Sequence, residues 1–249
     1  MPHVTPGRAL RLALALALVP LGTACSPEPA PVPAPEPTCA LPDPLPGLAA
    51  GSLSLPPNPS VLVLGDSYTE GYGAEPETKG YAYLVGRPLG WRVTVDGVGG
   101  TWYVNPGPRA EGTYLQRLPR RQGQTYDLVV LQGGSNDRDT AYPVLRDAVA
   151  RTVDAVRSEF AGAAVVVLGP STPYGKPDPT RLLSRCVLAG EAAARQLPFI
   201  DPIGEGWFVD GDGKRYANPE KGHPSNAGYR HIADRFVADV RVLQGTAPS

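Results

Sequence analysis

Five short apolar runs of strand length constrain the fold of this chain more than any other feature. They span residues 61–64, 91–95, 128–131, 164–168 and 198–200. The central runs are continuous rather than alternating, which is typical of strands covered on both faces. Stretches with helical periodicity lie between the runs. Strand and helix therefore alternate about five times, which indicates a mostly parallel five-stranded sheet with helices on both faces.

The helical stretches carry apolar stripes at helical spacing. One stretch covers residues 144–160, and another follows the segment "GHPSNAG" near the end of the chain. A third covers residues 178–197 and is expected to bury Leu182 and Cys186. Together with the sheet they predict an α/β domain, a three-layer α/β/α sandwich over residues 60–245.

The first part of the chain differs from this domain. Arg8 and Arg11 precede an apolar run of about ten residues, and small residues follow, which is the order of a secretory signal. The run is too short to span a bilayer core of roughly 30 Å as a helix. We expect a signal peptide over residues 1–24. The segment "LGTAC" resembles a bacterial lipobox, so Cys25 is expected to carry a lipid, the alternative being plain secretion with cleavage nearby.

A proline-rich linker is expected over residues 25–59. Twelve of the thirty prolines lie between residues 26 and 60, and such a run favours extended polyproline conformations over helices or central strands. It reads as a stalk that holds the domain away from a membrane surface, so the protein is expected in the extracellular space or cell envelope.

The net charge bears on the expected binding partners, and the cysteines bear on an expected disulfide. The formal net charge is −1 and there is no basic run, so nucleic acid is not an expected partner. Of three cysteines, Cys39 and Cys186 remain if lipid takes Cys25. In an exported protein they are expected to pair as a disulfide, the alternative being two unpaired thiols.

Polar segments follow three of the predicted strands. "GDSYTEG" follows the first, "DGVGGTWY" the second and "QGGSND" the third. Ligands of such sheets bind beyond the carboxyl ends of the strands, so these segments are expected to converge on one edge. Ser67 in the first segment is a candidate nucleophile, which needs a base and donors for the oxyanion that forms.

The candidate base is His223. His3 leaves with the signal peptide, and His231 reads as a solvated residue on the polar side of the last helix. His223 precedes Pro224 in the loop that leads into that helix, where it is free to point at the active edge. Asn136 offers a side-chain amide to an oxyanion. "GVGG" lacks the spacing of a dinucleotide loop and no P-loop appears, so no cofactor is expected.

Four blocks together resemble the SGNH hydrolases, also called the GDSL family of esterases and lipases. They are "GDSYTEG", "GVGGT", "GSND" and "GHPSNAG", in the family's order, and the resemblance covers about residues 61 to 240. It implies a flavodoxin-like sandwich and hydrolysis of acyl esters without a cofactor. It also implies an oxyanion hole made by the Ser67 N–H, the Asn136 amide and a glycine N–H, which is Gly100 or its neighbour Gly99.

One position departs from the family's pattern. The family places an aspartate three residues before the histidine, where it orients the ring. Glu220 stands there in this chain. Asp210 and Asp212 are the alternatives for the third member of the triad, although a tight turn also explains them.

The expected function is that of an exported, monomeric serine esterase. No long apolar lid is visible between the blocks, which favours short acyl groups, including O-acetyl groups on carbohydrate. Trp102, Tyr103 and Tyr114 could stack on a sugar or belong to the core. The two rivals are an acyltransferase that acts on a cell-envelope glycan with the same serine, and a non-catalytic carbohydrate-binding module.

Overall fold

The computed structural model describes residues 1, 3, 39–43, 45 and 47–246. Nearly all of the expected signal peptide, the expected lipid anchor at Cys25 and the first part of the proline-rich linker lie outside the described residues, so these expectations stay predictions. Residues 37–249 belong to one compact unit of the chain.

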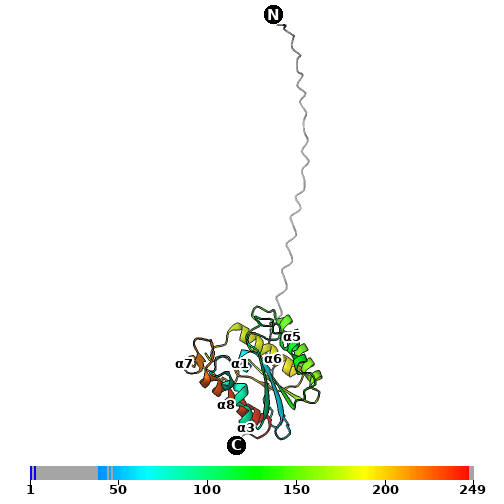
Figure 1. Ribbon diagram of the computed structural model, residues 1–249, viewed down its shortest axis with the longest axis vertical. Helices are drawn as coiled ribbons and strands as arrows, with labels where there is room; N and C mark the ends of the chain where they lie inside the picture. The colour runs from blue at the N-terminus through cyan, green and yellow to red at the C-terminus, as the bar shows by residue number, and fades with distance from the viewer. Residues whose placement is uncertain (2, 4–38, 44, 46, 247–249) are drawn as a thin grey trace. The chain divides into compact units, whose positions relative to one another are not determined.

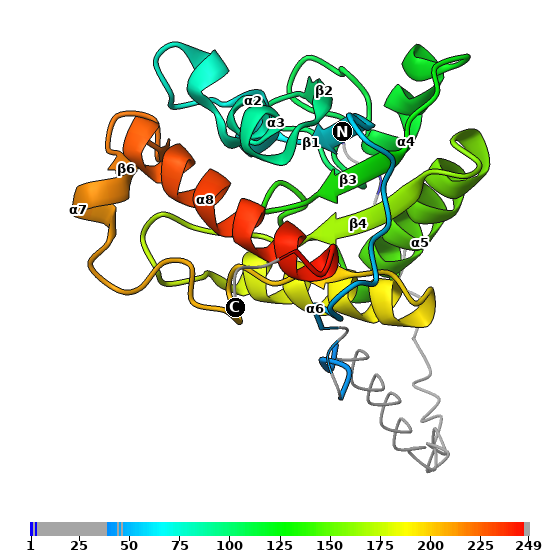
Figure 2. The same cartoon turned by 90° about the horizontal axis from the view of Figure 1, so that it is seen from below.

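Five parallel strands form the central sheet, in the order β2-β1-β3-β4-β5 (Figure 2). Val61 on β1 pairs with Val93 on one side and Leu128 on the other, which places β1 inside the sheet. The predicted strands are confirmed, with ends that differ by at most two residues. Their bounds are Ser60–Gly65 for β1, Arg92–Gly97 for β2, Leu128–Gln132 for β3, Ala164–Leu168 for β4 and Phe199–Ile200 for β5.

Helices cover both faces of this sheet (Figures 1 and 2). Leu62 and Leu64 face the layer of α5 (Tyr142–Glu159) and α6 (Pro179–Ala194). Val61 and Val63 face the layer of α8, with two short helices beside it. Alternate β1 side chains thus enter two separate cores, and the expected three-layer α/β/α sandwich is confirmed. The second layer contains α2 (Tyr81–Leu84), α3 (Gly86–Leu89) and α8 (Asn226–Leu243).

The apolar stripes predicted for α5 and α8 are buried, and in α6 Cys186 is buried as expected, whereas Leu182 is not. Leu182 is 45% exposed. The buried line of α6 runs instead through Ser184, Leu188 and Ala192. Leu182 lies two residues before Ser184, about 200° around the helix, and therefore points to the opposite side.

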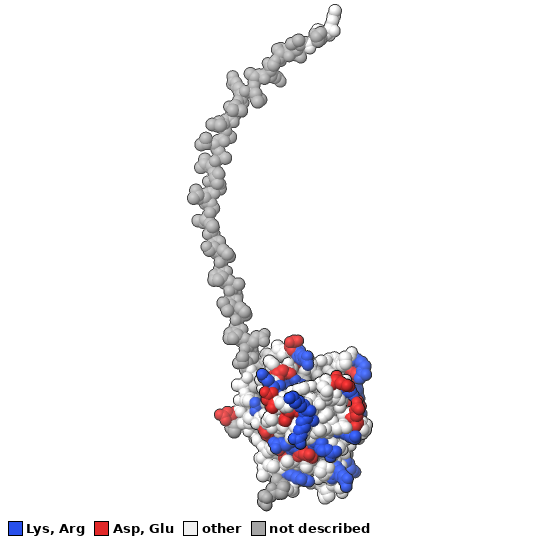
Figure 3. Space-filling view, turned by 90° about the vertical axis from the view of Figure 1, so that its left-hand side faces the viewer, with Lys and Arg blue, Asp and Glu red and all other residues white. Residues whose placement is uncertain are grey.

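Short elements complete the domain and surround the carboxyl edge of the sheet. Within the part of the chain that the structure describes, no helix is both long and apolar enough to cross a bilayer. Basic and acidic side chains both lie at the surface on the side that carries α7 (Figures 1 and 3). The short elements are α1 (Ser67–Glu70), η1 (Glu77–Lys79), α4 (Tyr114–Arg117), η2 (Leu118–Arg121), α7 (Gly213–Tyr216), β6 (Ala217–Asn218) and β7 (His223–Pro224).

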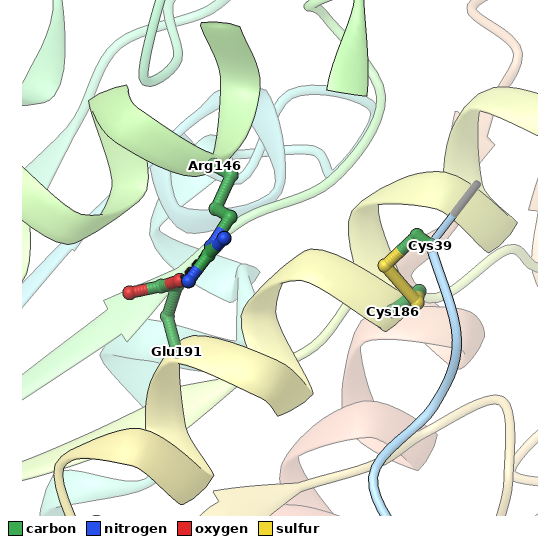
Figure 4. The surroundings of a disulfide bond; sticks show 4 residues. All are labelled: Cys39, Arg146, Cys186 and Glu191. Atoms are coloured by element: carbon green, nitrogen blue, oxygen red, sulfur yellow. Dashed lines mark hydrogen bonds and ion pairs between the residues drawn. A yellow bond between two sulfur atoms is a disulfide. The ribbon is translucent and has the colours of Figure 1, made fainter. Parts of the chain in front are cut away.

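A disulfide joins the segment before the domain to α6 (Figure 4). The Cys39 and Cys186 sulfurs lie 2.05 Å apart and their Cα atoms 6.1 Å apart, so the expected pairing is present. Nearby, the Arg146 guanidinium of α5 donates to the Glu191 carboxylate of α6 at 3.0 Å. These two links fasten the chain entry and α5 to the same helix.

Candidate active site

Ser67 begins the short helix α1 directly after β1. A side chain at Gly65 would place its Cβ 2.1 Å from Thr69 Oγ1, so only glycine fits at the end of the strand. The Asp66 carboxylate accepts a hydrogen bond from the Tyr68 N–H at 2.8 Å and caps α1. Asp66 therefore braces the turn. The Ser67 N–H stands in the first turn and has no acceptor among the described residues.

The Ser67 hydroxyl lies against the His223 ring. Ser67 Oγ and His223 Nε2 are 2.8 Å apart, and His223 Nδ1 lies 2.7 Å from the Lys221 carbonyl oxygen. A carbonyl oxygen only accepts, so the neutral ring carries its proton on Nδ1 and leaves Nε2 as an acceptor. The serine hydroxyl therefore donates to Nε2, which is the arrangement a general base needs.

Burial favours the neutral form of this histidine. Desolvation lowers the pKa of His223, the bond to the Lys221 carbonyl opposes this shift, and the positive charge of Arg181 adds to it. An imidazole with a lowered pKa is unprotonated at neutral pH. It can then take the hydroxyl proton as the serine oxygen attacks.

Glu220 does not occupy the expected third position. The Asn218 side-chain oxygen accepts from the Glu220 N–H at 3.1 Å and from the Lys221 N–H at 3.3 Å. Gly222, at φ 64°, closes this turn. The turn exposes Glu220 and brings the Lys221 carbonyl to the ring. The expected glutamate is thus replaced by a backbone carbonyl.

The alternative acids do not reach the ring either. The Asp212 carboxylate accepts from the Val209 N–H at 2.8 Å and forms the tight turn that the sequence also allows. Asp210 is exposed in the same turn. Among the described residues, the Nδ1 partner of His223 is therefore the Lys221 carbonyl alone.

The expected oxyanion donors line one cleft with Ser67 and His223. This cleft has a volume of about 560 Å³ and includes Gly99, Gly100 and Asn136. The Glu70 carboxylate lies against Gly99, and one of its oxygens would be 2.7 Å from a Cβ at that position. The Gly100 N–H has no acceptor among the described residues.

The Asn136 side chain is held at the edge of this cleft. Its amide donates one hydrogen bond to the Thr101 carbonyl at 3.1 Å, which leaves the second amide hydrogen for another acceptor. The Asp137 carboxylate accepts from the Val104 and Asn105 N–H groups at 3.0 and 2.5 Å. The loop after the glycine block is thereby tied to the asparagine block.

A fully buried arginine fastens the ends of two strands beneath the site. The Arg117 guanidinium donates to the Gly65 carbonyl at 2.8 Å and to the Asp96 carbonyl at 3.4 Å. Sequence analysis does not identify Arg117, Asp137 or Glu70 as part of the site. Of these three residues, only Asp137 could have been found from the sequence, because it directly follows "GSN".

The aromatic residues after the glycine block belong to the core. Trp102 and Tyr114 are fully buried and Tyr103 nearly so, so the alternative of stacking on a sugar does not hold for them. A different aromatic residue is at the cleft. The Tyr72 ring lies edge-on to the His223 ring at 4.9 Å and is 39% exposed.

Metal ligands do not gather at this site. Within the residues that the structure describes, no three His, Cys, Asp or Glu side chains are placed to hold one ion. What the site offers is a hydroxyl donor, a neutral imidazole acceptor and three groups with free N–H donors around one cleft. This set can add a serine oxygen to a carbonyl and stabilise the resulting oxyanion.

Comparisons with known proteins agree with this arrangement. The model of the GDSL-like Lipase/Acylhydrolase family matches residues 63–231, a range that includes every expected site residue. A protein named GDSL lipase from Mycobacterium tuberculosis is 32% identical over 187 residues, which cover 71% of this chain and 79% of that protein.

Solved structures share the fold at lower identity. The crystal structure of TesA is 22% identical, with a TM-score of 0.58, over 74% of this chain and 99% of its own. A family two carbohydrate esterase from Clostridium thermocellum, solved with cellohexaose, is 20% identical, with a TM-score of 0.58, over 76% and 65%. A two-domain esterase active on acetylated mannans is 18% identical, with a TM-score of 0.55, over 76% and 51%.

Proposed function

This chain belongs to the GDSL-like lipase/acylhydrolase family of ester hydrolases, and we propose that Ser67 is its nucleophile and His223 its general base. The observation that carries the proposal is the 2.8 Å contact between Ser67 Oγ and His223 Nε2, with the proton of the ring fixed on Nδ1. The alternative of a non-catalytic carbohydrate-binding module is not proposed, because the family consists of ester hydrolases.

In the first half of the reaction, Ser67 Oγ forms a bond to the carbonyl carbon of the ester while its proton moves to His223 Nε2. The carbonyl oxygen becomes an oxyanion, and the Ser67 N–H, the Gly100 N–H and the Asn136 amide donate to it. The C–O bond to the alcohol then breaks, and the alcohol oxygen takes the proton from Nε2. Water repeats these steps on the acyl-serine and releases the acid.

The imidazolium formed in each half-reaction faces the Lys221 carbonyl. A carbonyl dipole fixes the ring and its tautomer, as the carboxylate of a serine protease does. It carries no full negative charge, so it stabilises the imidazolium less. This is consistent with a His223 pKa that lies below its ordinary value.

We further propose that the substrate is a short acyl ester, such as an O-acetyl group, on a carbohydrate. The cleft has polar side chains at its walls, including Glu70 and Arg109, which suit a hydroxyl-rich alcohol part. Three proteins of the same fold are described as carbohydrate esterases or as active on acetylated mannans. A rate comparison across nitrophenyl esters from acetyl to palmitoyl tests the acyl part, and a fastest rate at palmitoyl would contradict it.

The place of action proposed here is the outer face of the cell membrane, with a lipid on Cys25. The Cys39–Cys186 disulfide supports an exported protein, because disulfides persist in oxidising compartments. In a bacterial host, Cys25→Ser should release active protein from the membrane fraction. Wild-type protein that is soluble and begins at another residue would contradict the lipid anchor.

Turnover of nitrophenyl acetate tests the catalytic pair. Ser67→Ala and His223→Ala should each lower kcat/KM by about 10³-fold or more, and the double variant should lose little more because the two residues act as one unit. Unchanged thermal melting of each variant is the control. A His223→Ala loss that multiplies with the Ser67→Ala loss would contradict the pairing.

A further inference from the structure

A second hollow lies beside the active-site cleft, on the side of the domain that carries α7 and the start of α8. We call it the basic hollow and define it by Lys79, Arg215, Tyr216, Arg230 and His231. Figure 3 looks onto this side of the domain, where Lys and Arg atoms lie at the surface with Asp and Glu atoms among them. Its volume is about 530 Å³, which falls in the range of about 300–1,000 Å³ of small-molecule sites.

The cations of the basic hollow are not neutralised by the domain. Lys79, Arg215 and Arg230 are exposed, and none has a carboxylate partner within ion-pair distance among the described residues. One carboxylate, that of Asp234, lines the hollow with them. The hollow therefore carries a net positive charge, and a concave wall of one sign attracts a ligand of the other.

The wall of the hollow is preformed. The His231 and Tyr216 rings are stacked with centroids 4.7 Å apart. The Arg215 guanidinium lies over the Tyr216 ring, 4.8 Å from its centroid. His231 Nε2 bonds the Trp207 carbonyl. His231 is thus half-buried and fixed, which differs from the solvated role that the sequence suggests.

The basic hollow and the active-site cleft are neighbours. Glu77 of η1 lines the cleft and Lys79, two residues later, lines the hollow. Likewise, His223 lines the cleft and Asn226, three residues later, lines the hollow. The Asn226 amide fastens the ridge between them, because it exchanges two hydrogen bonds with the Glu75 backbone at 2.8 and 3.0 Å.

We propose that the basic hollow binds an anionic group, a carboxylate or a phosphate, on the alcohol part of the substrate whose ester lies at Ser67. This inference rests on the proposed esterase function. An alcohol part longer than one sugar extends from the cleft across the ridge at η1, and a negative charge on its next unit meets the three unpaired cations. The site thereby selects acylated acidic glycans over neutral ones.

A flat anionic lipid surface is the rival ligand. Segments that bind such surfaces by charge usually carry about four to eight Lys or Arg residues. This hollow has three cations around a concavity with a stacked aromatic floor, and it adjoins the cleft. These features favour one anionic group of the substrate over a lipid surface as the ligand of the hollow. The experiment below includes membrane binding as one of its outcomes.

The test compares esters that differ in charge. The probes are nitrophenyl acetate, acetylated mannotriose, an acetylated trimer of galacturonic acid and an acetylated trimer of glycerol phosphate. The variants are Lys79→Gln/Arg230→Gln and, as a control, Arg157→Gln, which removes an exposed charge from α5 on the opposite face of the sheet.

The double variant should lower kcat/KM for a charged trimer by about 3–30-fold, mainly through KM, since each exposed charge pair contributes about 0.2–1 kcal/mol. The two neutral esters should change less than about 2-fold, and the control should behave as wild type. The charged trimer whose rate falls in the double variant shows whether the hollow binds a carboxylate or a phosphate. Added NaCl should lower the rate on that trimer only.

Four results would overturn the inference, and they point to different errors. Equal effects on charged and neutral esters, or no preference of the wild type for either charged trimer, would refute it while leaving the esterase function intact. Binding to vesicles of phosphatidylglycerol that the double variant loses, with unchanged rates on the charged trimers, would assign the hollow to a membrane. Wild-type protein that hydrolyses none of the four esters would refute the proposed function as well.

Discussion

Removing the charge of Glu220 distinguishes a backbone carbonyl as the partner of the histidine from the carboxylate of the family's usual triad. In a serine protease, changing the aspartate that orients the histidine to asparagine lowers kcat by about 10⁴-fold. Here the Glu220 side chain is exposed, and the histidine bonds the Lys221 carbonyl instead. Exposed substitutions of this kind usually change free energies by about 0.5 kcal/mol or less. We therefore expect Glu220→Gln to change kcat/KM by no more than about 2-fold.

The assay is the pH profile of kcat/KM for nitrophenyl acetate between about pH 4 and 9. Activity requires neutral His223, whose pKa is lowered by burial. The rate should therefore rise with pH through an acidic limb centred below the ordinary histidine value of 6.5. Glu220→Gln should leave that limb in place. A carboxylate partner would hold the His223 pKa up, so its removal would lower both the rate and the pH of the limb.

A change at Asn218 is the matched comparison. Asn218→Ala removes the acceptor of the Glu220 and Lys221 N–H groups, and each such hydrogen bond contributes about 1 kcal/mol. The Lys221 carbonyl should then be less well fixed, and kcat should fall by about 5–50-fold. A loss above about 10²-fold for Glu220→Gln, with an active Asn218→Ala, would refute the assignment of the carbonyl.

Three further predictions concern the oxyanion, the disulfide and a buried acid. Asn136→Ala should lower kcat by about 10²-fold with a smaller change in KM, and an effect on KM alone would make it a binding residue. Cys39→Ser should lower Tm by about 5–10 °C, because the disulfide closes a long loop in the unfolded chain; an unchanged melting curve would show that it contributes little stability. Burial and the neighbouring Glu205 carboxylate raise the pKa of Asp239 from 3.8 to about 7. The folded chain keeps the Asp239 proton up to about pH 7, whereas the unfolded chain keeps it only below pH 3.8. The stability that protonated Asp239 contributes is therefore complete below pH 3.8 and is lost as the pH rises through about 7. Asp239→Asn should therefore stabilise the domain by about 1–3 kcal/mol more at pH 8 than at pH 5, and a gain that is equal at both values would contradict the raised pKa.

The sheet and two of its helices follow from the sequence because their signals are strong and local. The strand at residues 128–132 is a continuous buried run, and a covered parallel strand requires that composition. The stripe of α5 combines large residues such as Leu145 and Val153 at one spacing. In α6 the expectation fails at Leu182, which is exposed, and the buried face includes Ser184 and Ala192, whose small side chains give no strong apolar signal.

The candidate site is predictable only where the chemistry belongs to a side chain. Ser67 and Asn136 stand in short segments after β1 and β3, and parallel strands bring such segments to one edge, whereas His223 stands in the segment that leads into α8. The acceptor for His223 Nδ1 has no sequence signal, because every residue has a carbonyl. A turn fixed by Asn218 and Gly222 selects the one at Lys221. The spacing of Glu220 suggests a carboxylate partner, whereas the ring lies against the Lys221 carbonyl.

Covalent labelling of the serine is the most direct test of the Ser67–His223 pair. A fluorophosphonate forms a bond from phosphorus to an activated serine oxygen as fluoride leaves, and peptide mass spectrometry locates the adduct. We predict one adduct, on Ser67, that forms much more slowly in His223→Ala and at an unchanged rate in Glu220→Gln. An adduct on another residue, or labelling of Ser67 that does not depend on His223, would contradict a serine esterase built on this pair.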